Sequence, residues 1–151
     1  GCMLWACLRA KDVFCRQAAA LFSGAFLCVA MFVLYPTCID FRPAAEGAGV
    51  FRALCRLIYA HDAPVNVFPS LHCYEALVLH LVTFRAPPLR AHKALRLASF
   101  ALVVLICLST LLIKQHSAAD LIAGCALAVA AHSLTTYLFS KRRSHHDHTT
   151  V

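Results

Sequence analysis

Apolar residues in this chain are gathered into four long runs, and most of the charge lies between the runs. The runs cover 17–36, 69–84, 98–113 and 118–139. A helix needs roughly 20 mainly apolar residues to cross a bilayer, so the first and last runs are long enough, while the middle two need their flanks or a thin, deformed boundary. The pattern predicts an all-α, polytopic transmembrane helix bundle with about four spans.

Composition agrees with a membrane protein, because 61% of the residues are hydrophobic and only 14% are charged. The nine cysteines lie partly inside apolar runs and form no CxxC pair, so we interpret them as small buried hydrophobic residues, not as disulfides or zinc ligands. The net charge is +7, but the basic residues flank the apolar runs and do not cluster with aromatic ones. Membrane topology explains this charge, and no nucleic-acid partner is expected.

The remaining segments complete the predicted organisation. Residues 48–60 place apolar side chains on one side and Arg52 and Arg56 on the other, which predicts a short interfacial helix. Residues 1–16 mix apolar and charged side chains, as in an interfacial segment or the end of a missing span. The transmembrane domain is expected over 17–143, followed by a disordered polar tail over 144–151.

The last two apolar runs are separated by residues 109–120, which place Lys114, His116 and Asp120 at membrane depth. Ionisable groups at this depth are costly and usually functional. If the segment is helical, His116 and Asp120 share one face, and the carboxylate can accept a hydrogen bond from one imidazole nitrogen. An imidazole held in this way is a prepared nucleophile or base.

Two further polar clusters fall on the same side of the predicted bundle. Arg42 follows the first run, and Ser70 and His72 follow Pro69, which suits the first turn of a helix. Taken alone, Arg42 fits an interfacial arginine, and His72 fits a packed histidine. Together, Arg42, Lys114 and a helix N-terminus make an anion site, and two imidazoles can divide the roles of nucleophile and acid. No carboxylate cluster suited to magnesium accompanies them, so we predict a metal-free phosphohistidine route without a cofactor.

The distribution of charge predicts which way these clusters face. With four spans, ten of the fourteen lysines and arginines fall on the side of residues 1–16, the turn over 85–96 and the tail. Positive residues favour the cytoplasm. The candidate site is therefore expected on the extracytoplasmic side.

These residues resemble the type 2 phosphatidic acid phosphatase superfamily, whose pattern is Arg-Pro, then Pro-Ser-x-His, then Ser-Arg-x5-His-x3-Asp. The matches are Arg42-Pro43, Pro69-Ser70-Leu71-His72, and Ser109 with His116 and Asp120. Residues 68–72 and 114–116 look most like the branch that includes inositol phosphorylceramide synthases and their bacterial relatives. Members of the family commonly have six spans, so the resemblance implies that two upstream spans are missing from this N-terminally truncated chain.

The resemblance also implies a role for each residue. His116 would attack phosphorus to form a phosphoenzyme, with Asp120 orienting the ring, and His72 would protonate the leaving lipid oxygen and then activate water. Thr110 stands where the family has an arginine, and we expect Lys114 to supply the lost charge. The expected phosphate-binding residues are Arg42, Ser70, Ser109 and Lys114.

The leading hypothesis is an integral-membrane phosphatase whose substrate is a phosphorylated lipid, such as phosphatidic acid or a polyprenyl diphosphate. A lipid phosphotransferase of the inositol phosphorylceramide synthase type is the main alternative, and an inactive relative or membrane scaffold is the third. Acceptor choice depends on pocket shape and not on the catalytic groups, so the sequence leaves hydrolysis and transfer open. It also leaves the lipid and the oligomeric state unknown.

Overall fold

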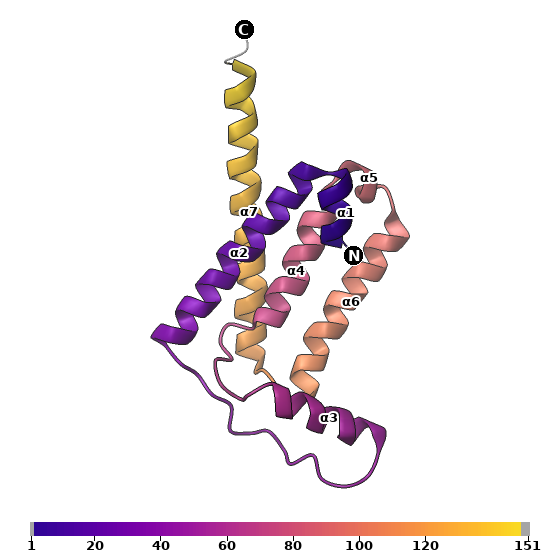
Figure 1. Cartoon of the computed structure of the whole chain (residues 1–151), viewed down its shortest axis with the longest axis vertical. Coiled ribbons are helices and arrows are strands. Elements are labelled where there is room, and N and C mark those ends of the chain that lie inside the picture. The colour runs from indigo at the N-terminus through magenta and orange to yellow at the C-terminus, as the bar shows by residue number, and fades with distance from the viewer. Residues whose placement is uncertain (1, 149–151) are drawn as a thin grey trace.

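The computed structural model describes residues 2–148, and within them the predicted all-α class is confirmed. Apart from one β-bridge between Cys38 and Val65, the regular structure of this part of the chain is helical (Figure 1). The helices in chain order are α1 (Cys2–Arg9), α2 (Lys11–Leu34), α3 (Val50–His61), α4 (Leu71–Thr83), α5 (Pro87–Arg90), α6 (Lys93–Leu112) and α7 (Ala118–His148).

Three helices are long and apolar enough to cross a bilayer: α2, α6 and the Ala118–Lys141 part of α7. Large apolar side chains such as Phe22, Phe26 and Leu105 are exposed on them, as expected of helices that face lipid. The remaining predicted span, residues 69–84, corresponds to α4, which has only 13 residues. At 1.5 Å per residue it is about 20 Å long, too short to cross the hydrocarbon core alone.

The short helix α4 lies at the centre of the bundle and packs against α2, α6 and α7 (Figure 1). Two polar contacts attach it to α2: the Tyr74 hydroxyl donates to the Ala20 carbonyl, and Gln17 Nε2 donates to Thr83 Oγ1 over 2.6 Å. The buried core combines small residues of the long helices with larger residues of α4. Its members are Ala20, Tyr74, Val78, Val82, Ala128 and Ala131.

Two glycines allow α4 to approach its neighbours closely. A Cβ atom at Gly24 of α2 would lie 2.0 Å from the Tyr74 ring, and one at Gly124 of α7 would lie 2.4 Å from the Ser70 carbonyl oxygen. Real Cβ atoms do not approach other atoms so closely, so each position requires the absence of a side chain. Small residues at helix contacts serve this purpose in membrane bundles.

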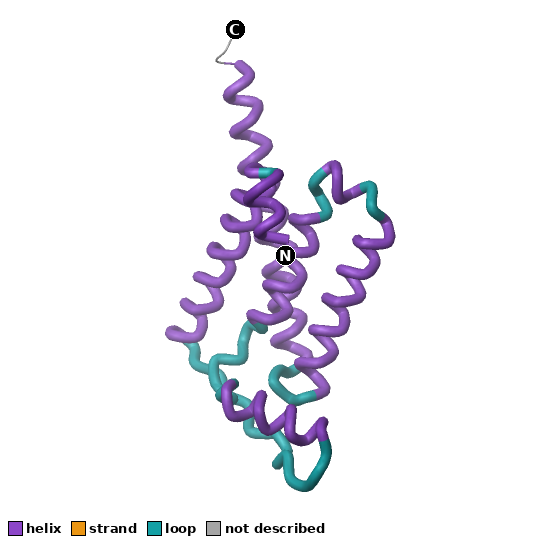
Figure 2. Tube along the Cα trace, turned by 45° about the vertical axis from the view of Figure 1, so that its right-hand side comes forward, coloured by secondary structure: helices purple, strands orange, loops and turns teal. Residues whose placement is uncertain are grey.

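The predicted interfacial helix is α3, which crosses one end of the bundle (Figure 1). Its apolar residues Val50, Phe51, Leu54 and Leu57 are all exposed, as expected of a helix whose apolar face meets a membrane surface. The long loops on both sides of α3 are gathered at this same end (Figure 2). This is the end at which the three predicted polar clusters lie.

The two ends of the chain differ from the expectation. Residues 2–9 form α1 and α2 begins at Lys11, so the first span starts earlier than predicted. Helix α7 continues through His148, so 144–148 are helical where a disordered tail was expected, and 149–151 lie outside the described residues. No glycine or proline follows Gly124, so the sequence contains no strong signal that ends the helix.

Gly124→Ala is expected to destabilise the bundle, because the new methyl group would meet the Ser70 carbonyl and force α4 and α7 apart. Overpacking of this kind costs about 1–3 kcal/mol. Thermal unfolding in detergent, followed by circular dichroism, measures the loss. Ala130→Val adds bulk at an exposed position of the same helix and should leave the midpoint nearly unchanged. Equal midpoints for the two variants would show that the helices are not held this closely.

Candidate functional site

The loops before and after α3 are joined by hydrogen bonds. The Asn66 amide donates to the Thr37 carbonyl over 2.6 Å. The Thr37 hydroxyl accepts from the amides of Val67 and Phe68, at 3.2 and 3.1 Å. The loop that carries Arg42 is therefore attached to the loop that leads into α4.

Helices α4 and α7 begin side by side. Ser70 caps α4 by accepting a hydrogen bond from the Cys73 amide, and its own amide donates to the Asp120 carbonyl over 3.0 Å. At the start of α7, the Ser117 amide donates to Asp120 Oδ2 over 2.7 Å, and the Asp120 amide donates to Ser117 Oγ over 3.3 Å. This reciprocal pair is a capping box. The Ser70 hydroxyl therefore caps the N-terminus of α4, and the Asp120 carboxylate caps the N-terminus of α7.

His116 lies in the turn between α6 and α7 and not in a helix, which corrects the helical placement considered for it. The residue is only 7% exposed, and its Nδ1 lies 2.9 Å from the Val67 carbonyl oxygen. A carbonyl can only accept, so Nδ1 carries the proton of the neutral ring, and Nε2 keeps its lone pair. Nε2 lies 3.4 Å from Nδ1 of His72, in the first turn of α4.

Asp120 does not form the expected hydrogen bond with His116. Its Oδ2 lies 3.8 Å from His116 Nδ1, which is ion-pair distance but beyond a hydrogen bond. The expectation depended on a shared helix face, and His116 precedes the helix, so its ring turns to Val67 instead. The carboxylate acts on the imidazole through its charge.

The surroundings of His116 lower the pKa of its imidazole below the ordinary value. Burial is the largest cause, because it disfavours the charged ring, and the neighbouring His72 adds to the lowering. The charges of Asp120 and Asp62 and the Val67 carbonyl act in the opposite direction. The neutral ring, which a nucleophile or base requires, is therefore favoured near neutral pH.

His72 and His116 border one pocket of about 270 Å³, together with Leu71, Asp62 and Gln115. The gap of 3.4 Å between their nitrogens is too small for a phosphorus atom to enter. His72 is exposed on its other side, so a change of its side-chain rotamer is the movement that would open this space.

Arg42 is bound to Asp62, a residue that the sequence analysis did not select. Its Nη2 lies 2.7 Å from Asp62 Oδ2, which also accepts from Gln115 Nε2 over 3.0 Å. The guanidinium lies 5.1 Å from the centre of the Tyr59 ring, and its Nε donates to the Lys114 carbonyl over 3.3 Å. Arg42 therefore has a fixed orientation, and its charge is balanced.

The signal for Asp62 and Gln115 was present in the sequence. Asp62 is one of only seven acidic residues, and it opens the loop that leads to His72. Gln115 directly precedes His116. A polar residue adjacent to His116 and an acidic residue at the start of the loop before His72, in a chain that is otherwise so apolar, are the signals that point to Gln115 and Asp62.

The remaining predicted phosphate ligands make other contacts. Ser109 Oγ donates to the Ile106 carbonyl of its own helix over 2.8 Å. Lys114 is exposed, and its Nζ lies 5.7 Å from the centre of the Phe41 ring. Among the described residues, the wall of the histidine pocket includes none of the predicted phosphate ligands, which are Arg42, Ser70, Ser109 and Lys114. Within 2–148, no three His, Cys, Asp or Glu side chains are grouped to hold a metal ion.

These features define a helical membrane protein with a paired-histidine pocket at one end of its bundle. The model of the PAP2 superfamily matches residues 1–134, which is most of the chain. The chain therefore belongs to the PAP2 superfamily, and the resemblance found in its motifs is confirmed. Neither the curated proteins nor the solved structures contain a match to it.

The lowered pKa of His116 predicts that acid destabilises the fold. The unfolded chain takes up a proton at this residue near pH 6.5, the ordinary value for histidine, whereas the folded protein does so only at lower pH. The unfolded state therefore binds more protons as the pH falls below about 6.5, and the free energy of unfolding decreases. Above that pH, the contribution of His116 is fully present.

Thermal midpoints measured from about pH 8 to pH 5 test this prediction. His116→Gln should show a weaker fall with acid than the unsubstituted protein. His61→Gln, which removes an exposed histidine of α3, should retain the full dependence. The same slope in both variants would contradict the assignment of the effect to His116.

Proposed function

We propose that this chain is an integral-membrane phosphatase that removes phosphate from a lipid phosphate through a phosphohistidine on His116. The observation that carries the proposal is the arrangement of the two imidazoles. His116 Nε2 keeps its lone pair because Nδ1 donates to Val67, and it faces His72 across the shared pocket. Membership of the PAP2 superfamily supports phosphoester chemistry at this pair.

In the proposed reaction, His116 Nε2 attacks phosphorus, and the bond from phosphorus to the lipid oxygen breaks as the N–P bond forms. Protonated His72 gives its proton to the leaving lipid oxygen. Neutral His72 then takes a proton from water, which attacks phosphorus and breaks the N–P bond. The Val67 carbonyl and the charge of Asp120 favour the positive ring that forms on His116.

Arg42 is the proposed anchor for the phosphate oxygens. A guanidinium has more N–H groups than its contacts with Asp62 and Lys114 use. Phosphate can therefore bind the remaining N–H groups without removing Asp62, and Gln115 lines the pocket as a further amide donor. In this proposal, Asp62 holds the guanidinium in position before the substrate arrives.

Thr110 is the observation that favours an inactive relative as the second candidate. Its hydroxyl donates to the Cys107 carbonyl over 2.9 Å, and the side chain is buried. The charge that the family pattern places here is thus replaced by a neutral group that faces its own helix. Phosphate release by the purified protein decides between this candidate and the phosphatase.

We also propose that the pocket faces the extracytoplasmic side of the membrane. The support is the charge distribution, because ten of the fourteen lysines and arginines belong to segments at the other end. A lipid phosphate of the outer leaflet would then reach the pocket beside α3.

Phosphate release from phosphatidic acid and from a polyprenyl diphosphate, measured in EDTA, tests the phosphatase. The unsubstituted protein should release phosphate from one of them at the same rate with and without the chelator. His116→Ala should lower the rate at least about 10³-fold, because it removes the nucleophile. His72→Ala should lower it by about 10² to 10⁴-fold, because it removes the proton donor.

His61→Ala provides the control, because His61 is an exposed histidine at the same end of the bundle. Its rate should match that of the unsubstituted protein. Activity that disappears in EDTA and returns with a divalent cation would contradict the metal-free route. Phosphate transfer to an added lipid alcohol, with no release to water, would establish the transferase alternative.

Arg42→Gln is expected to lower kcat/KM by about 10²-fold, because the neutral amide loses the charged hydrogen bonds to phosphate. It also leaves Asp62 without its ion-pair partner. The matched control is Arg56→Gln on α3, because Arg56 bonds only to the loop carbonyls of Ala45 and Gly47 among the described residues. A control that loses as much activity as Arg42→Gln would show that the effect comes from the loop and not from phosphate binding.

A further inference from the structure

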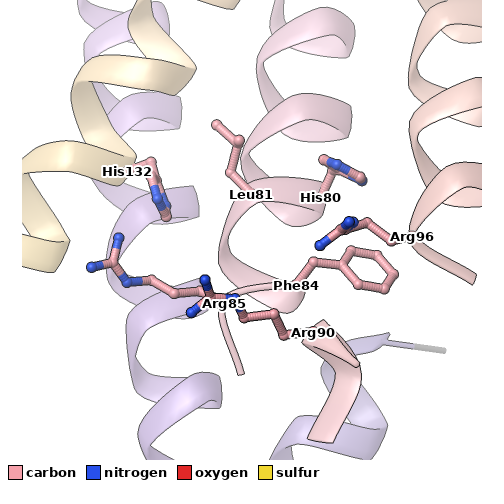
Figure 3. A pocket seen from close by; sticks show the side chains of 7 residues that line it. All are labelled: His80, Leu81, Phe84, Arg85, Arg90, Arg96 and His132. Carbon is pink, nitrogen blue, oxygen red and sulfur yellow. The ribbon is translucent and has the colours of Figure 1, made fainter. Parts of the chain in front are cut away.

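A second cavity, of about 530 Å³, lies among the ends of α4, α5 and α6 at the basic turn and the middle of α7. This is the end of the bundle opposite the histidine pocket (Figure 1). Figure 3 shows side chains of these segments turned toward a common space. Its main wall residues are His80, Phe84, Arg85, Arg90, Arg96 and His132.

The wall of this cavity is strongly positive. It contains three arginines and two histidines but no carboxylate among the described residues. Within the described part of the chain, the side chains of Arg85, Arg90 and Arg96 form neither a hydrogen bond nor an ion pair. Like charges that converge without a counter-charge repel each other, so an anion between them would be stabilising.

The convergence of these arginines goes beyond what membrane topology requires. Basic residues that set orientation need only lie near the end of a span. Here Arg85 follows α4, Arg90 belongs to α5 and Arg96 lies in the first turn of α6, yet all three line one cavity. His132, at the α7 wall, has a buried Nδ1 with no hydrogen-bond partner in the described structure.

A neighbouring cavity of about 390 Å³ shares His80 and Arg96 with the first and adds Lys93, Leu97 and Phe100. The positive space thus continues into one whose wall also includes the apolar side chains of Leu97 and Phe100. Guanidinium groups bind the oxygens of a phosphate in pairs, whereas apolar walls suit the hydrocarbon next to it. The two cavities together match an amphiphile with a phosphate head.

We propose that the cavity formed by Arg85, Arg90, Arg96 and His132 binds the phosphate group of an anionic phospholipid. This site lies at the opposite membrane surface from the histidine pocket and is separate from the proposed reaction. Because its residues come from or flank α4, α6 and α7, a bound phosphate links the ends of α4 and α6 to the middle of α7. Binding therefore stabilises the folded bundle.

Thermal midpoints of the full chain in an uncharged detergent test this site. The probes are dihexanoyl phosphatidylglycerol, dihexanoyl phosphatidylcholine and inorganic phosphate at equal concentrations. Phosphatidylglycerol should raise the midpoint by several degrees, roughly 2–6 °C near saturation, and phosphatidylcholine should raise it much less. If inorganic phosphate alone gives the full shift, the bound anion is free phosphate and not a lipid head group.

The double variant Arg85→Gln/Arg96→Gln should lose at least half of the phosphatidylglycerol shift. Both side chains are exposed, so the substitution should leave the unliganded midpoint nearly unchanged. The matched control Arg9→Gln/Lys11→Gln removes two charges at the same end but outside the cavity, and it should keep the shift. Any binding in the histidine pocket contributes equally to both variants.

The decisive quantity is therefore the difference between the two double variants in the rise of the thermal midpoint that phosphatidylglycerol causes. An equal shift in both, or an equal effect of phosphatidylglycerol and phosphatidylcholine on the unsubstituted protein, would overturn the proposal. Loss of the shift in the cavity variant alone would establish the site. This result does not depend on phosphate release, so it can succeed or fail independently of the phosphatase.

Discussion

The hydrogen bond from the Ser70 amide to the Asp120 carbonyl is the contact on which the candidate site depends. It holds the first turn of α4 against the first turn of α7, and Gly124 makes it possible because any Cβ there would meet the Ser70 carbonyl. His72 lies in one of these turns and His116 just before the other. The backbone positions from which the two imidazoles project are therefore set by these contacts.

The shortness of α4 has a structural consequence. A helix of 13 residues inside a bundle of longer ones leaves space at one end, which the loops around α3 fill. Those loops bring Arg42 and Asp62 to the start of α4, next to the histidine pair, where Gln115 of the turn between α6 and α7 donates to Asp62. A helix that crossed the bilayer completely would occupy the volume in which these polar groups meet.

The sequence predicted α2, α4, α6 and α7 well, because each coincides largely with an apolar run. The polar residues between the runs marked the end of the bundle that holds the pocket. The sequence analysis misplaced the ring of His116. Lys114 has a left-handed φ of 54°, which ends the helical path after α6, and a capping box then starts α7 at Ser117 and Asp120. The Ser-x-x-Asp pattern was readable in the sequence, whereas the bond from His116 to Val67 joins residues 49 apart and depends on how the loops fold.

Charge is arranged differently at the two ends of the bundle. At the histidine end, Asp62 balances Arg42, and Asp120 lies near His116, so the guanidinium and the imidazole are held in fixed positions by partners within the protein. At the other end, three arginines share a cavity and lack such partners among the described residues. A reaction centre gains from fixed groups, because groups that are already oriented need no reorganisation as charge develops. A binding site gains more from unbalanced charge, because an arriving anion then has no internal carboxylate to displace. In the two proposals, arginine therefore binds phosphate from a fixed, balanced position at one end and from an unbalanced cluster at the other.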